Sequence, residues 1–213
     1  MRNNYDIQAA QARELFLSYD QEFACRRLGL EYDETSIFLR FLGQPVTIRR
    51  SDGQVFDAAG QPADFSTVMS VYDVLCRSRE TPVLKGEFVP ITALNRIHGT
   101  HPVHENFNGK DAAFFAGKTD ALRSACLRRG GMLWGNGDVS CILPVFDFFP
   151  VRLCFWDADD EFPASLQFFW DANALDFAHY ETLWYMSGAL TKKLMQEIIL
   201  KPDENKTRSG LFS

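Results

Sequence analysis

Two apolar runs on either side of one acidic turn constrain the fold of this chain most strongly. Residues 151–156 (VRLCFW) and 164–170 (ASLQFFW) are rich in apolar and aromatic side chains, and the segment DADDEFP lies between them. Branched and aromatic residues favour strands, whereas Asp and Pro favour turns. The pattern therefore predicts a β-hairpin with a charged, stiff turn.

Helical and extended patterns alternate along the rest of the chain. The spacing of apolar residues predicts helices over residues 4–29, 64–79, 110–129 and 179–200. Strand patterns cover residues 37–42, 46–50, 83–91 and 139–146. Several strands follow one another through short turns, which favours antiparallel pairing. We expect a single α+β domain over residues 1–200, with a mixed, mainly antiparallel sheet packed with three to four helices, and a polar tail over residues 201–213.

Composition and charge argue against several classes of protein. Of the 213 residues, 46% are hydrophobic and 14% aromatic, which is typical of a globular chain. The net charge of −6 argues against nucleic-acid binding, which needs a positive surface. No apolar run reaches the roughly 18 residues that span a bilayer, and the N-terminus has no signal-peptide pattern. We expect a cytoplasmic protein that binds neither nucleic acid nor membranes.

The five cysteines are widely spaced along the sequence, at positions 25, 76, 126, 141 and 154. Zinc and iron–sulfur sites usually begin with a close cysteine pair, because one turn then presents two thiolates to one metal. That spacing is absent here. An odd number of cysteines without an export signal predicts reduced and mostly buried thiols.

Three sequence elements, taken in order, resemble one uncharacterised family. They are PVLKGEFV at 82–89, GDVS at 137–140, and the run from Trp156 to Ser165 that contains DEFPAS. Over about residues 35–195 they resemble a bacterial family known as domain of unknown function 3786. The resemblance implies no established activity, but it implies an association with corrinoid and iron–sulfur proteins of one-carbon metabolism in anaerobes. Some members carry a cysteine-rich iron–sulfur segment, and this chain lacks its close cysteine spacing.

The acidic turn is the first candidate site. Its carboxylates are Asp157, Asp159, Asp160 and Glu161. The alternate residues Asp157, Asp159 and Glu161 imitate the first ligands of a calcium loop. However, Phe162 replaces the turn glycine of such loops, and Phe168 replaces their final bidentate glutamate. Two interpretations stay open: a site for Mg²⁺ or an amine ligand, or a solvated turn whose Asp side chains accept bonds from the local backbone.

Two further carboxylates and a tryptophan extend this candidate site. Glu87 and Asp138 each lie beside a glycine at a predicted strand end. A cleft where these ends meet the acidic turn would bring carboxylates together and separate their pKa values, which suits acid–base chemistry. Trp156 adds a flat apolar surface; the four tryptophans either line a pocket for a flat ligand or anchor the core.

A histidine-rich segment is the second candidate site. His98, His101 and His104 recur every third residue, and Pro102 excludes a regular helix there. Three imidazoles on an extended loop suit Zn²⁺ or Ni²⁺. The alternative is a polar loop whose histidines have no metal.

The sequence indicates an accessory or binding domain, which the resemblance links to corrinoid or iron–sulfur one-carbon metabolism. Its ligand is expected to be a protein partner or a small molecule, and the sequence identifies no cofactor. The alternative is a small metal- or carboxylate-dependent enzyme with an acidic strand-end site. The fold distinguishes the two hypotheses. An enzyme needs a concave pocket that holds Glu87, Asp138 and the acidic turn, whereas a binding domain exposes an apolar patch.

Overall fold

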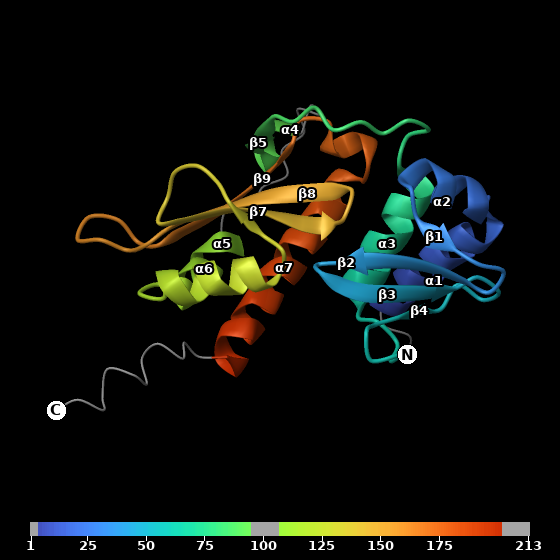
Figure 1. Ribbon diagram of the computed structural model, residues 1–213, viewed down its shortest axis with the longest axis horizontal. Coiled ribbons are helices and arrows are strands. Elements are labelled where there is room, and N and C mark those ends of the chain that lie inside the picture. Colours follow the sequence, from blue (N-terminus) through green and yellow to red (C-terminus); the bar gives the residue numbers. More distant parts are fainter. Residues whose placement is uncertain (1–3, 95–106, 202–213) are drawn as a thin grey trace.

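The structure, a computed structural model, describes residues 4–94 and 107–201. Within these ranges the chain forms seven α-helices and two sheets whose strand pairs are all antiparallel (Figure 1). The predicted α+β class with a mainly antiparallel sheet is therefore confirmed, although the strands divide between two sheets. The candidate metal residues His98, His101 and His104 lie outside the described residues, as does the tail after residue 201.

The N-terminal part combines three helices with a four-stranded sheet. The helices are α1 (Asn4–Ser18), α2 (Gln21–Leu28) and α3 (Phe65–Arg77). The sheet has the order β1 (Glu31–Tyr32), β2 (Ser36–Phe41), β3 (Gln44–Arg49) and β4 (Val55–Phe56). One helix was predicted over residues 4–29. The structure divides it at Asp20, which is the N-cap of α2. The Asp20 side chain accepts a hydrogen bond of 2.9 Å from the backbone N–H of Phe23.

The C-terminal part holds a five-stranded sheet and the longest helix of the described residues. Its strands are β5 (Phe88–Pro90), β6 (Met132–Leu133), β7 (Val139–Phe146), β8 (Phe149–Trp156) and β9 (Ser165–Asp171), in the order β5-β9-β8-β7-β6. Its helices are α4 (Ile91–Leu94), α5 (Phe107–Phe115), α6 (Thr119–Arg128), the 3₁₀ helix η1 (Ala174–Asp176) and α7 (Tyr180–Leu200). The predicted hairpin is present, since Trp156 pairs with Ser165 and Val151 with Trp170.

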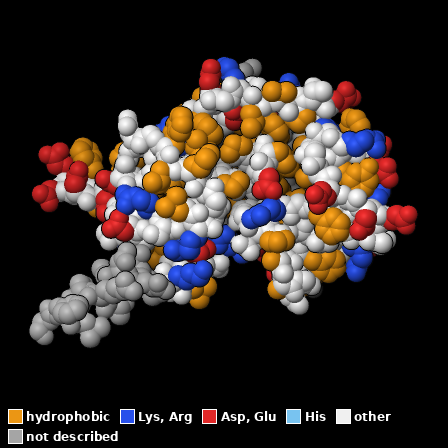
Figure 2. Space-filling model, viewed as in Figure 1, with side chains coloured by type: hydrophobic (Ala, Val, Ile, Leu, Met, Phe, Trp, Pro, Cys, Tyr) orange, Lys and Arg blue, Asp and Glu red, His pale blue; other side chains and the backbone are white. Residues whose placement is uncertain are grey.

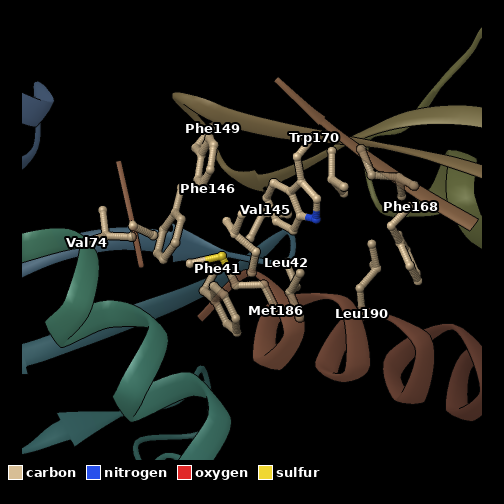
Figure 3. Close-up of a cluster of buried hydrophobic side chains, with 14 of the residues drawn as sticks. Phe41, Leu42, Val74, Val145, Phe146, Phe149, Phe168, Trp170, Met186 and Leu190 are labelled. Atoms are coloured by element: carbon tan, nitrogen blue, oxygen red, sulfur yellow. The ribbon is translucent and has the colours of Figure 1, made fainter. Parts of the chain in front are cut away.

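Helices α5, α6 and α7 cover one face of the five-stranded sheet. Leu143, Leu153 and Trp170 point to this face and are almost completely buried. The side chains of Trp170 and Phe168 face Met186 and Leu190 of α7 (Figure 3). No described helix is long and apolar enough to cross a membrane. All five cysteines are buried and free, as the sequence predicted.

The turn between β2 and β3 joins the two sheets. The backbone N–H of Leu42 donates to the carbonyl of Val145 at 2.8 Å. This carbonyl lies at a register shift between Pro144 and Phe146, where the β7–β8 pairing is irregular. The ring of Phe41 packs against that of Phe146, with centroids 5.1 Å apart and the planes tilted by 46°. Buried side chains from both sheets therefore form one continuous core.

Candidate functional site at the outer face of the five-stranded sheet

Asp138 and Asp157 lie together at the adjoining ends of β7 and β8. The backbone N–H of Asp157 donates to Oδ2 of Asp138 at 2.7 Å. The carboxylate of Asp157 in turn accepts the backbone N–H of Gly117, with distances of 3.0 and 3.1 Å to its two oxygens. Both carboxylates therefore bond to the backbone and hold the strand ends and the α5–α6 connection in place.

The remaining turn carboxylates lie at the exposed tip of the β8–β9 hairpin. Oδ1 of Asp159 accepts the backbone N–H groups of Glu161 and Phe162 at 2.9 and 2.7 Å. These donors lower the pKa of Asp159. Asp160 and Glu161 are exposed, and acidic side chains project at the left end of Figure 2, where Figure 1 shows this hairpin. Among the described residues, no cluster of three His, Cys, Asp or Glu side chains has the arrangement of a metal site.

Glu87 lies at the opposite end of the sheet from the acidic turn. It precedes Phe88, which pairs with Asp171 at the far end of β9, whereas Ser165 at the near end pairs with Trp156. Seven strand residues separate these ends by about 20 Å. Glu87 forms an ion pair with Lys85 at 2.8 Å. The structure therefore does not bring Glu87, Asp138 and the acidic turn into one cleft. The reason is that β5 runs antiparallel to β9 and begins where β9 ends, far from the turn.

The helices α5 to α7 leave one face of the five-stranded sheet open, and we call it the outer face. A row of side chains crosses this face. Met132 pairs with Ile142, Ile142 with Arg152, and Arg152 with Phe169. Residues directly opposite one another in paired strands point to the same side of a sheet. The residues that follow Ile142 in β7 and Arg152 in β8 are buried under the helices. The side chains of the row therefore point to the outer face.

Two tryptophans extend the outer face toward the acidic turn. The backbone N–H of Trp134 donates to the carbonyl of Ser140 at 2.9 Å, which keeps Trp134 beside β7. Trp156 lies four residues after Arg152 in β8, so the alternation of the strand places both on the same face. Met132, Trp134 and Trp156 are 65%, 59% and 37% exposed. Hydrophobic side chains are visible at the surface over this sheet (Figure 2).

Arg152 places a cation in the middle of this apolar surface. Its guanidinium lies over the ring of Phe169, 5.5 Å from the centroid, and the side chain is half-buried. The loop that follows Trp134 closes over it at Gly135, where φ is +76° and an added Cβ would lie 2.6 Å from Nη2 of Arg152. A glycine at this position lets the loop approach the guanidinium and hold it in place.

Sequence reasoning identified only part of this surface. Trp156, Asp138 and Asp157 were candidates. The predicted hairpin contains Trp156 and Asp157, and the pairing of β7 with β8 brings Asp138 beside them. Met132, Ile142, Arg152 and Phe169 were missed. The place of Arg152 between the apolar residues Val151 and Leu153 is a usable signal for its direction, but the row depends on the exact register of four consecutive strands.

Two clefts lie elsewhere, along α7, and residues of α1 and α3 also line them. Their volumes are about 680 and 650 Å³. Neither is lined by Glu87, Asp138 or a carboxylate of the acidic turn. The concave carboxylate pocket expected of the enzyme hypothesis is thus not found in either cleft.

Comparison with known proteins places the chain in a family. No curated protein and no solved structure matches it. One family model matches residues 20–193, which includes both sheets and most of α7. Since this match spans most of the chain, the protein belongs to the family described as a domain of unknown function (DUF3786).

Proposed function

We propose that this protein is an accessory domain that binds a partner protein through the outer face of its five-stranded sheet. The observation that carries the proposal is the group of exposed apolar side chains Met132, Trp134 and Trp156 on one sheet face. Isolated exposed apolar residues are common, but a contiguous group of them marks binding surfaces. Tryptophan and arginine contribute most to binding energy at protein interfaces, and Arg152 lies within this group.

The charge beside the outer face favours a basic partner segment. Asp160 and Glu161 are exposed at the hairpin tip, just beyond Trp156, and neither forms an ion pair within the described part of the chain. Complementary charges steer association and fix its orientation. The partner segment is therefore one whose lysines or arginines flank aromatic or aliphatic residues, so that the apolar residues contact the tryptophans and the cations face the hairpin tip.

The arrangement of the carboxylates favours the binding domain over the carboxylate-dependent enzyme. Asp138 and Asp157 are used in backbone bonds, and Glu87 lies at the far end of the sheet. The link with corrinoid or iron–sulfur metabolism and the bacterial origin stay predictions of the family resemblance, and the cytoplasmic location stays a prediction of the sequence pattern.

Selection of peptides from a random displayed library on the immobilised full chain tests the proposal. Peptides that combine basic with aromatic or aliphatic residues are expected to be enriched on the wild-type protein and on a Phe38→Ala control. Phe38 is 41% exposed but lies in the other sheet. The Trp134→Ala/Trp156→Ala variant is expected to lose the enrichment. Equal enrichment on this variant would show that the outer face is not the binding surface.

A second measurement isolates the charge contribution. The Asp160→Asn/Glu161→Gln variant is expected to bind a selected peptide about threefold more weakly at low salt, since exposed charge pairs contribute modestly, and the difference is expected to shrink as salt is added. The Glu31→Gln/Glu34→Gln variant changes the net charge equally at exposed positions in the N-terminal part and serves as the control. A loss of the same size in both variants would exclude a specific acidic contact.

A further inference from the structure

The larger cleft contains an aspartate–histidine pair that the outer face does not use. This polar cleft, of about 680 Å³, lies between α1, α3 and α7. Asp73 and Arg77 of α3 line it, together with His179 and Glu181 at the start of α7. Its volume is within the range of small-molecule sites.

Asp73 fixes both the backbone and the ring of His179. Its Oδ2 accepts the backbone N–H of His179 at 2.7 Å, and its Oδ1 lies 2.5 Å from Nδ1 of the ring. An ionised carboxylate only accepts hydrogen bonds, so the proton of the neutral imidazole is on Nδ1. The lone pair of Nε2 is then on the other side of the ring. The His179 side chain is 55% exposed, whereas that of Asp73 is only 11% exposed.

Arg77 lies one helical turn after Asp73 and therefore on the same side of α3. Both oxygens of Asp73 are engaged by His179. Within the described residues, Arg77 forms no ion pair. Arg77 is exposed and lines the cleft without a bound carboxylate. Glu181 is the other free charge of the wall and lies in the first turn of α7, where a carboxylate complements the helix dipole.

We propose that the polar cleft binds a small ligand with an oxyanion group, either a carboxylate or a phosphate. Arg77 pairs with the oxyanion, because a guanidinium donates two parallel hydrogen bonds to such groups. Nε2 of His179 accepts a hydrogen bond from a hydroxyl or protonated oxygen of the same ligand, and Asp73 is the positioning residue that sets the tautomer. This site lies outside the outer face and goes beyond partner binding.

A purely structural role explains only part of these observations. The two hydrogen bonds that Asp73 accepts from His179 join α3 to the start of α7, which accounts for Asp73 and for the backbone of His179. They do not account for an unpaired Arg77 in the same cleft, or for a ring nitrogen that is left without a partner in the described part of the chain.

Long-range ¹H–¹⁵N NMR of the histidine rings in the full chain tests the proposal. The His179 signals are assigned by their loss in His179→Gln, and inorganic phosphate and malonate are titrated at constant pH. At least one anion is expected to shift the His179 signals in a saturable way. Arg77→Gln is expected to weaken that binding roughly tenfold, as for the loss of a charge-assisted bond. Arg40→Gln, which removes an exposed arginine from β2, is the control.

The outcomes separate the ligand sources and the roles. A response to phosphate alone assigns a phosphate ligand, and a response to malonate alone assigns a carboxylate. Asp73→Asn, checked for folding by thermal melting, is expected to increase the Nε2-protonated tautomer of His179. No saturable shift with either anion, or equal affinity in Arg77→Gln and wild type, would overturn the proposal. Because Trp134→Ala leaves this cleft intact, failure here is distinguishable from failure of partner binding.

Discussion

At the scale of single residues, Asp171 shows how hydrogen bonds stabilise a buried carboxylate in this fold. Its side chain is almost completely inaccessible. Oδ1 accepts the backbone N–H groups of Lys85 and Asn173 at 2.9 and 2.8 Å, and Oδ2 accepts that of Gly86 at 2.7 Å. The carboxylate thereby fixes the loop before β5 against the end of β9, and a buried charge with several donors is tolerated.

Replacing Asp171 by alanine is expected to lower the free energy of unfolding by about 3 kcal/mol, because each backbone N–H left without an acceptor costs about 1–3 kcal/mol. Urea denaturation of the two proteins measures this difference. Asp171→Asn keeps one oxygen acceptor and is expected to lose less. A change below about 0.5 kcal/mol, as is usual at surface positions, would contradict the role given to the carboxylate.

At the scale of elements, Glu197 joins α6 to α7. Its carboxylate accepts a hydrogen bond of 2.9 Å from Nε of Arg128 and lies 3.0 Å from Nη2 of Arg129. Burial acts to raise the pKa of Glu197, but the hydrogen bond from Arg128 and the charges of both arginines more than offset it, so the pKa is lowered from its usual 4.5.

A lowered pKa in the folded state makes this contribution to stability dependent on pH. It is fully present above the unfolded-state value near 4.5 and is lost as the pH falls through the lower folded-state pKa. Glu197→Gln is therefore expected to cost about 1–2 kcal/mol at pH 7, and the cost is expected to disappear in acid. Denaturation curves of both proteins from pH 7 to pH 3 check this. A cost that is constant over this range would contradict the ion-pair account.

The sequence predicted the helices and strands that have long apolar stripes, but it did not predict where a helix is interrupted. The helix expected over residues 179–200 is α7, and the strand expected over 139–146 is β7. The helix expected over 110–129 divides into α5 and α6 around Gly117, whose N–H bonds to Asp157. Gly117 has φ of +69°, a left-handed conformation that ends a helix, so the glycine was a local signal for a break that apolar periodicity alone does not show.

At the scale of the whole molecule, the turn at Leu42 and Gly43 holds the two sheets together. Gly43 has φ of +76°, and an added Cβ would lie 3.3 Å from the carbonyl oxygen of Arg129. Gly43→Ala is expected to cost about 1–2 kcal/mol from backbone strain, plus the cost of this contact. Gly60→Ala is a matched control, because Gly60 has φ of +72° with nothing within 4 Å of an added Cβ. Equal losses in urea denaturation would show that the close approach of Gly43 to the Arg129 carbonyl adds no cost.

The candidate site was predictable only where neighbours in the sequence are neighbours in the sheet. The β8–β9 hairpin places Trp156 beside the acidic turn, as its pattern implied. Glu87 lies far from the acidic turn because β5 pairs antiparallel with β9. The outer face is formed by the pairing of β6, β7, β8 and β9. The pairing of β5 with β9 joins segments that are distant in sequence and has no local signal. The strands of the outer face follow one another along the chain, but their exact register has no local signal. His179 and Asp73 are 106 residues apart, so their contact was equally beyond sequence reasoning.

The affinity of one selected peptide for the Trp134→Ala variant tests the central claim most directly. Fluorescence anisotropy of a labelled peptide gives the dissociation constant for the wild type, Trp134→Ala and the Phe38→Ala control. A tryptophan at the centre of an interface contributes about 2 kcal/mol or more, so the variant is expected to bind roughly thirtyfold more weakly. The control is expected to bind like the wild type. Equal dissociation constants for all three proteins would contradict a binding surface on the outer face.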